Sequence, residues 1–478
     1  MRFRPILLAA LVVLAGCGGT VGSEGSTTET STGTVTPTPT PASASTAEVT
    51  TTPSETPAHP GFGDPSSDRL GWEAGYWHDE PLDVNATDGL NRSERGAVVA
   101  RTMARVEYLR GLEFESRVPV EVVDRATYRT DENVTATGWD EVVWEALLLI
   151  GEDRSVEEVL GAFYGASVQG SYVPSEDRIV VVSGEDRPTI DRRTLAHELV
   201  HALQDQHFES ALSRSNRTSR DATVAWQGLI EGDAGYVEDR YERRCGSEWS
   251  CLPRSAGAGA SLDGDAGVYV AAYHPYSDGP SFVHRLRERG GWKAVNAAYA
   301  DPPTSSTQVI DPGRYPDWSP ATVRVSDRSA DDWRRFDRSP VGTTVGEASL
   351  FATIWANGGT EPFHLQRPSR PHRTYNYTHP ATAGWAGDRL VPYRNGSGAT
   401  GYVLRTEWAT ADDAETFAAT YRDLLRTRRG AERREDGVLV VPAGPYADAF
   451  RVERSGTTVT ITNAPTVAAL DAVHGRRE

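Results

Sequence analysis

The pattern of apolar and polar positions in the first half of the chain predicts helices that alternate with short strands. Apolar residues recur at helical spacing in "RGAVVARTMARVEYLRGL" (residues 95–112) and in "SVEEVLGAFYG" (155–165), where Ser155 is suited to cap the helix. "VPVEVVDR" (118–125) has the composition of a strand, and "SYVPSEDRIVVVSG" (171–184) predicts two strands joined by a polar turn. We therefore expect an α+β fold with a small sheet in this region.

A second group of strands and helices follows near the C-terminus. The strand candidates and two helix candidates lie in "RLVPYRN", "TGYVLRTEWA", "DDAETFAATYRDLLRTR", "VLVVPAG", "DAFRVERSG", "TVTITNA" and "TVAALDAVHGRR", of which the third and the last are helical. We expect residues 381–478 to form a small α+β module that supports packing or binding, and residues 66–380 to form the larger functional unit.

The N-terminus has the pattern of a targeting segment. "MRFR" is basic, and the apolar run that follows is too short to span a bilayer as a helix. The run ends in "LAGC" without an A-x-A cleavage site and resembles a lipobox, in which Cys17 would carry the lipid; an ordinary secretory signal is the alternative. Residues 18–65 are rich in Thr, Ser and Pro and predict an extended stalk. The order of these segments, with a signal in residues 1–17, then a stalk and then a domain, predicts a location. We expect a lipid anchor to hold the protein on the extracellular face of the cell membrane.

Composition narrows the choice of partners. The formal net charge is −18, and 48 of the 49 basic residues are arginine, with no basic stripe, so nucleic acid is not an expected partner. The acidic, lysine-poor composition resembles that of proteins from extreme halophiles. Six N-x-S/T sequons agree with an exported glycoprotein. In an oxidising compartment, Cys245 and Cys251 are expected to form one small disulfide loop.

The segment "TLAHELVHALQDQHF" (194–208) holds the candidate chemistry. Apolar residues at helical spacing and the absence of glycine predict a helix from about residue 190 to residue 206. His197 and His201, four residues apart, would project from one face and could bind one Zn²⁺ ion. Glu198 is rotated by about 100° from His197, so it is suited to act as a general base on a water rather than as a ligand.

The third ligand has more than one candidate. His207 follows His197 at the metzincin spacing, but Gln204 stands where that motif has a helix-breaking glycine, so a continuous helix would carry His207 away. The second candidate is Glu231, in a predicted second helix spanning residues 221–244; Glu238 is the fallback on the same helix.

Two further expectations concern the surroundings of this site. Gly228, Gly232 and Gly235 would weaken a free helix, and their presence suggests that another backbone approaches closely. Asp205 and Asp233 are candidate partners for the outer N–H groups of the histidine ligands, although each is equally consistent with a surface charge.

The motifs resemble those of zincin metallopeptidases of the gluzincin type, which combine H-E-x-x-H with a glutamate on a later helix. More closely, the chain resembles a group of prokaryotic surface proteins that includes haloarchaeal surface lipoproteins. The matching motifs are "YVPSEDRIVVV", "TLAHELVHALQDQHF", "LIEGDA", "YHPYSDGPSFVHRLRERGGWKAVNAAYADPPTSSTQVI" and "GWAGDRLVPY". The resemblance implies that His197, His201 and Glu231 are zinc ligands and that Glu198 is the base.

The resemblance also implies a zincin-like fold, in which the edge strand of a small twisted sheet lies beside the active-site helix and pairs with an extended peptide substrate. Residues 179–182 are the candidate for that sheet. Tyr276 or His274 could stabilise an oxyanion, although structural packing is an alternative for both. Asp311 stands where relatives often have a histidine.

These observations favour a surface-tethered zinc-dependent hydrolase, most simply a metallopeptidase that acts on a peptide or protein. The alternative is a non-catalytic surface protein that retains the zincin fold and binds a cell-envelope partner. A hydrolase that acts on a non-peptide bond is a third possibility. An intact Glu198 favours an enzyme, because a structural zinc site needs no general base.

Overall fold

A computed structural model describes residues 65–476 except for a few short segments, namely 126, 129–133, 184–188, 209–211, 213–216, 254–264 and 362. The expected signal segment, Cys17 and nearly all of the stalk lie outside the described residues. Within the described residues, no helix has the length and apolar character needed to cross a membrane.

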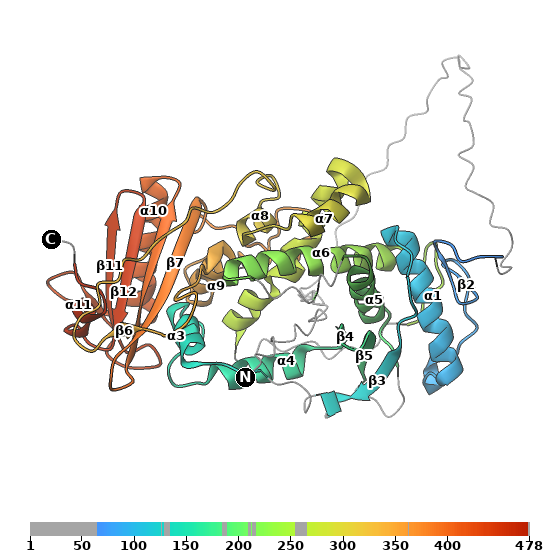
Figure 1. Ribbon diagram of the computed structural model, residues 1–478, viewed down its shortest axis with the longest axis horizontal. Coiled ribbons are helices and arrows are strands. Elements are labelled where there is room, and N and C mark those ends of the chain that lie inside the picture. The colour runs from blue at the N-terminus through green and yellow to red at the C-terminus, as the bar shows by residue number, and fades with distance from the viewer. Residues whose placement is uncertain are drawn as a thin grey trace, which may run out of the picture.

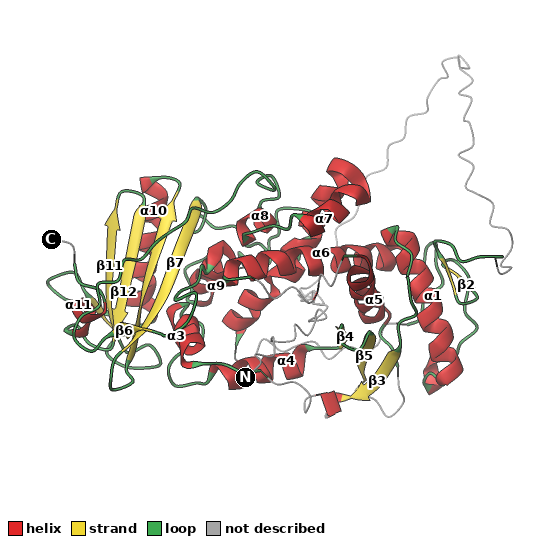
Figure 2. Ribbon diagram, in the orientation of Figure 1, coloured by secondary structure: helices red, strands yellow, loops and turns green. Residues whose placement is uncertain are grey.

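The described chain has an α+β fold that extends along one axis (Figures 1 and 2). A seven-stranded sheet lies at one end, long helices occupy the centre, and a small sheet with α1 lies at the other end. The N-terminal half contains β1 (Trp72–Glu73), β2 (Tyr76–Trp77), the 3-10 helix η1 (Ala86–Asp88), α1 (Arg92–Arg110), β3 (Val120–Asp124), α3 (Gly138–Ala146), α4 (Val156–Ser167), β4 (Gly170–Val173), β5 (Arg178–Ser183), α5 (Arg192–His207) and α6 (Arg220–Arg244).

The C-terminal half begins with α7, a long helix that contains two prolines and changes direction at Gly290 and Gly291. Its elements are α7 (Ala266–Ala300), α8 (Ser306–Ile310), β6 (Arg334–Arg335), α9 (Gly346–Ala356), β7 (Trp385–Arg394), β8 (Thr400–Trp408), α10 (Ala411–Arg428), β9 (Glu432–Arg433), β10 (Leu439–Val440), β11 (Ala449–Ser455), β12 (Thr458–Ala464) and α11 (Ala469–Val473). The helices and strands expected from sequence periodicity are all present within a few residues of their predicted bounds.

The small sheet has the order β3-β5-β4, with β3 parallel and β4 antiparallel to β5. Residues 179–182 therefore lie in its central strand, while β4 is the edge strand that packs on α5. The sheet and α5 are held together by apolar side chains. Ile179 and Val181 from β5 and Leu195 and Leu199 from α5 are buried in one hydrophobic core. Gly170 permits the close contact, since a Cβ there would lie 2.7 Å from the Thr194 side chain.

Helices α6 and α7 pack with direct backbone contact at the centre of the molecule. A Cβ on Gly232 would lie 2.4 Å from the Gly279 carbonyl oxygen, and a Cβ on Gly279 would lie 2.4 Å from the Gly228 carbonyl oxygen. The expectation of a close backbone approach is confirmed at Gly228 and Gly232, where the approaching segment is α7, whereas a Cβ on Gly235 would meet the Pro280 side chain of α7 at 3.0 Å.

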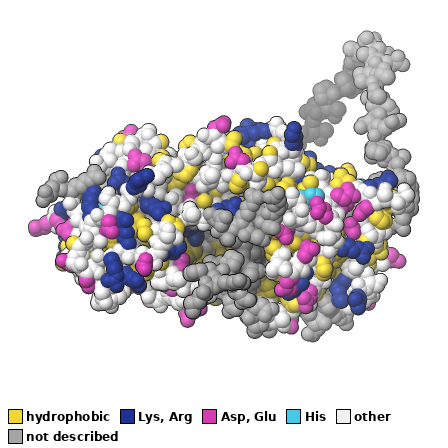
Figure 3. Space-filling view, viewed as in Figure 1, with side chains coloured by type: hydrophobic (Ala, Val, Ile, Leu, Met, Phe, Trp, Pro, Cys, Tyr) yellow, Lys and Arg dark blue, Asp and Glu magenta, His cyan; other side chains and the backbone are white. Residues whose placement is uncertain are grey.

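The C-terminal sheet has the order β6-β7-β8-β12-β11-β10-β9, and all its strand pairs are antiparallel. Helices α3 and α10 cover one face, where Trp385, Leu404 and Phe417 belong to the core. The boundary expected at residue 381 falls between β6 and β7, which pair with each other, and α3 comes from the N-terminal half. On the face shown in Figure 3, acidic and basic side chains are interspersed over this end of the molecule.

Candidate metal centre

Helix α5 presents two histidines on one buried face. Asp191 begins the helix by accepting hydrogen bonds from the backbone N–H groups of Arg193 and Thr194, each at 3.0 Å. The apolar side chains of α5, such as Leu195 and Leu199, are buried against the small sheet and α1. His197 and His201 are both fully buried, and their ring centroids lie 4.8 Å apart, as their spacing of four residues requires.

Helix α6 brings Glu231 between the two imidazoles. Its Oε2 lies 3.2 Å from His197 Nε2 and 3.3 Å from His201 Nε2. One donor atom from each of the three residues lies within 4.8 Å of the other two. Glu231 is only 2% exposed, so the carboxylate faces the histidines rather than solvent. The three residues expected as ligands are therefore brought together in space.

The outer nitrogens of both imidazoles have hydrogen-bond partners. His197 Nδ1 lies 3.1 Å from Glu238 Oε2, and His201 Nδ1 lies 2.8 Å from Gln204 Oε1. Glu238 is in turn paired with Arg193, whose Nε lies 2.5 Å from Oε1. Glu238, considered as a fallback ligand, thus occupies the outer side of His197. Hydrogen bonds at Nδ1 leave Nε2 of each ring facing Glu231.

The expectation that Asp205 and Asp233 accept hydrogen bonds from the outer N–H groups of the two histidines is wrong. Asp205 accepts a hydrogen bond from the Tyr172 hydroxyl at 3.1 Å. Asp233 accepts from Arg110 Nε at 2.8 Å and from the Tyr299 hydroxyl at 2.6 Å. Asp233 is two residues from Glu231 and therefore points to the opposite side of α6, whereas Glu238, seven residues on, returns to the same face.

His207 does not approach the other two histidines. Helix α5 continues through Gln204 to His207, as expected without a glycine at residue 204. His207 Nε2 lies 2.6 Å from the backbone carbonyl oxygen of Glu113. The side chain of Gln204 instead links His201 to α6, because its Nε2 donates to the Ile230 carbonyl oxygen at 2.9 Å.

Glu198 is held by the backbone of the edge strand β4. Its Oε2 accepts a hydrogen bond from the Tyr172 N–H at 2.7 Å, and its Oε1 is buried without a hydrogen-bond partner among the described residues. Burial raises the pKa of Glu198 to about 7, against the lowering effect of His201 and His197. One oxygen is therefore fixed, while the other is free to accept a proton.

The ligand candidates form a strongly coupled set of charges. Burial alone would lower the pKa of His197, but hydrogen bonds to Glu231 and Glu238 raise it to about 10. For Glu231 the directions are reversed. Burial alone would raise its pKa, but the charge of His201 and the hydrogen bond to His197 lower the pKa to about 2. Without a metal, a buried carboxylate at this position requires a protonated imidazole beside it.

The donor set fits a zinc ion. Two imidazole Nε2 atoms and one carboxylate oxygen are the ligand types of a catalytic zinc site with an open fourth position. Among the described residues, Glu198 Oε1 is buried without a hydrogen-bond partner, which is costly unless a ligand satisfies it. A cation at this position would replace the proton that the metal-free set requires.

Tyr276, but not His274, lies beside this centre. The Tyr276 hydroxyl is hydrogen-bonded to Glu231, and its ring stacks on that of His197 with centroids 6.3 Å apart. Burial and the charges of Glu231 and Glu198 raise its pKa well above the usual value, so the hydroxyl keeps its proton. His274 instead contacts Tyr377, and burial together with Arg373 lowers its pKa to about 3.

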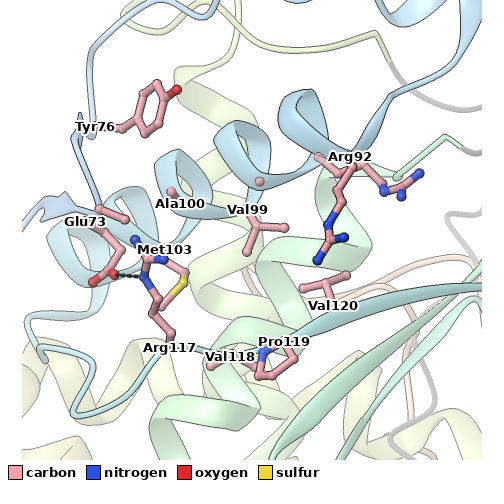
Figure 4. Close-up of a pocket in the computed structure, with 13 residues that line it drawn as sticks. Glu73, Tyr76, Arg92, Val99, Ala100, Met103, Arg117, Val118, Pro119 and Val120 are labelled. Carbon is pink, nitrogen blue, oxygen red and sulfur yellow. Dashed lines mark ion pairs between the residues drawn. The ribbon is translucent and has the colours of Figure 1, made fainter.

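Two other sequence expectations and one surface pocket lie outside the candidate centre. Asp311 ends α8 and accepts a hydrogen bond from Arg370 at 3.0 Å. The sulfurs of Cys245 and Cys251 are joined in a disulfide just after α6. A surface pocket of about 780 Å³ lies between α1 and the start of β3, where Arg92, Arg117 and apolar side chains line it (Figure 4). Its lining includes no residue of the candidate metal centre.

Comparison with known proteins gives one partial match. Residues 334–474 match a family described as a domain of unknown function (DUF8575). This region contains α9 and the C-terminal sheet and does not include His197, Glu198, His201 or Glu231. No curated protein matches the chain.

Proposed function

We propose that this protein is a zinc-dependent hydrolase, most simply a zincin-like metallopeptidase tethered to the outer face of the cell membrane. The observation that carries the proposal is the convergence of His197, His201 and Glu231 beside the unpartnered Oε1 of Glu198. A purely structural zinc site has no use for that free, buried carboxylate oxygen. The lipobox-like "LAGC" and the stalk support the tethered location.

In this proposal each residue has one role. His197, His201 and Glu231 would hold the zinc ion, which when bound would polarise a substrate carbonyl and lower the pKa of a water. Glu198 Oε1 would accept a proton from the attacking water and later donate it to the leaving amine. The Tyr172 N–H fixes Oε2, so the proton moves at Oε1. The Tyr276 hydroxyl, which hydrogen-bonds to Glu231 in the metal-free site, would turn from Glu231 to donate a hydrogen bond to the developing oxyanion.

The choice of a peptide substrate rests on the resemblance to zincins, in which an extended substrate pairs with an edge strand. Among the described residues, β4 pairs only with β5, and the Tyr172 N–H on its other edge donates to Glu198.

The test combines zinc analysis of the purified full-length protein with hydrolysis of a fluorogenic peptide library. The wild type is expected to hold one zinc per chain and to cleave peptides. Glu231→Ala should lose zinc and activity together. His207→Gln is the matched control on the same helix and should retain both, because His207 Nε2 faces the Glu113 carbonyl oxygen and not the candidate ligands. A wild type without zinc, or Glu231→Ala with full zinc content, would refute the assignment.

A further inference from the structure

Tyr172, in the edge strand β4, contacts helix α5 at two separate points. Its backbone N–H donates to Glu198 Oε2 at 2.7 Å, and its hydroxyl oxygen lies 3.1 Å from Asp205 Oδ2. Because Asp205 follows Glu198 by two helical turns, both side chains lie on one face of α5, about 10 Å apart along its axis. A single residue of β4 therefore holds the helix at the candidate base and again two turns later.

The same hydroxyl also reaches the turn that joins β4 to β5. It lies 2.8 Å from Oδ1 of Asp177, whose φ of 46° is in the left-handed region. Burial and the two carboxylates raise the pKa of Tyr172, so the hydroxyl keeps the one proton that Asp177 and Asp205 share. Helix α5, strand β4 and the turn after it thus meet at one phenol oxygen.

The ring of Tyr172 joins these contacts rigidly. The residue is 2% exposed and belongs to the hydrophobic core that connects β5 with α5. Two residues earlier, a Cβ on Gly170 would lie 3.5 Å from Cγ of Glu198, so β4 runs directly against the candidate base. Since the ring has little room to move, a displacement of the hydroxyl would be passed to the backbone N–H of the same residue.

Asp205 is partly buried without a basic partner among the described residues. Burial and the charge of Asp177 raise its pKa, and the hydrogen bond from Tyr172 opposes them. Its Oδ1 is buried with no hydrogen-bond partner in the described part of the chain. An acid in such surroundings costs stability, and its contact with the Tyr172 hydroxyl accounts for its presence.

We propose that Tyr172 is a positioning residue for the general base and that Asp205 acts through it. The hydroxyl, held by Asp205, fixes β4 on α5, which keeps the Tyr172 N–H on Glu198 Oε2 and leaves Oε1 to carry the proton. This inference rests on the proposed function, in which Glu198 is the base. The three candidate metal ligands have other hydrogen-bond partners, so zinc binding should not depend on this contact.

The experiment compares Tyr172→Phe, Asp205→Leu and the double variant with the wild type, each as full-length protein with zinc added. Tyr172→Phe keeps the N–H and the ring but removes the hydroxyl. The first readout, which needs no substrate, is amide hydrogen exchange at residue 172, and we expect it to be at least about tenfold faster in each single variant.

The second readout is peptide hydrolysis. In each single variant kcat should fall by about 10–100-fold, because the base is less well fixed, while KM and zinc content stay unchanged. Since Tyr172→Phe and Asp205→Leu break the same contact, the double variant should lose no more kcat than either single variant.

Two further variants serve as controls. Asp205→Asn keeps an oxygen that can accept from the hydroxyl, so it should retain most of the wild-type kcat and the slow exchange at residue 172. Tyr421→Phe removes another buried hydroxyl, which lies 3.5 Å from that of Tyr402 in the core of the C-terminal sheet. It should change neither readout.

The proposal is overturned if residue 172 exchanges at the wild-type rate in Tyr172→Phe, or if Tyr421→Phe loses as much kcat. It is also overturned if Tyr172→Phe keeps the wild-type kcat while Glu198→Gln is inactive. A wild type that hydrolyses no peptide would refute the proposed function instead, and amide exchange would still decide whether the hydroxyl holds the Tyr172 N–H on Glu198.

Discussion

Substitution of Gly232 by alanine tests how the contact between α6 and α7 positions Glu231. The added Cβ would lie 2.4 Å from the Gly279 carbonyl oxygen and 2.5 Å from its carbon. An ordinary C···O contact is about 3.3 Å, so the helices must separate locally by about 1 Å. The adjacent Glu231 would move with this backbone, whereas zinc–ligand distances tolerate only about 0.2 Å.

The expected effect on zinc is larger than the expected effect on folding. Overpacking costs about 1–3 kcal/mol, and the better helix propensity of alanine offsets about 1 kcal/mol of it. Zinc affinity should fall by at least about tenfold, comparable with the loss of a supporting interaction of a ligand. The assay is competition for zinc with a chromophoric chelator, together with Tm in the metal-free state.

Gly96→Ala is the matched control, because Gly96 lies in α1 with nothing within 4 Å of its added Cβ. It should leave zinc affinity unchanged and raise stability slightly, by about 0.5–1 kcal/mol. If Gly232→Ala binds zinc as tightly as the wild type, the reasoning that this backbone contact sets the position of Glu231 is wrong.

Three further substitutions test separate parts of the structure. Glu238→Gln should weaken zinc binding by about 10–100-fold in the same competition assay, because it removes the charge that faces His197 Nδ1; unchanged affinity would exclude this role. Tyr276→Phe should lower kcat by about 10–1000-fold at unchanged zinc content, and an equal kcat would remove Tyr276 from oxyanion stabilisation. Burial raises the pKa of Glu347 to about 7, so the folded state holds its proton more tightly and the free energy of unfolding should fall by up to about 3 kcal/mol as pH rises from about 4.5 to 7. In denaturant titrations across this pH range, the free energy of unfolding should change less with pH for Glu347→Gln than for the wild type. An equal pH dependence in the two proteins would contradict a raised pKa at Glu347.

Local periodicity was sufficient to predict much of the candidate centre. The i, i+4 spacing of His197 and His201 places both rings on one face in any continuous helix. The absence of a glycine at Gln204 correctly predicted that α5 would continue and carry His207 away. The glycines of α6 correctly indicated a close backbone contact.

Other features depend on tertiary contacts that no periodicity contains. Helix α7 contains Pro275 and Pro280, which ordinarily argue against a helix, so its length was not predicted. The N–H that holds Glu198 belongs to the backbone of Tyr172, and backbone groups leave no mark in a sequence pattern. The role of Glu238 could have been found, because residues 231 and 238 are two turns apart on one helical face.

The most direct test of the proposed chemistry is the rate of peptide hydrolysis by wild type and Glu198→Gln at equal zinc occupancy. The glutamine keeps the size of the side chain and an oxygen for the Tyr172 N–H, but it cannot accept the proton. We predict full zinc content and a loss of kcat of about 10²–10⁴-fold. Hydrolysis by Glu198→Gln at the wild-type rate, with zinc bound, would contradict the assignment of Glu198 as the general base.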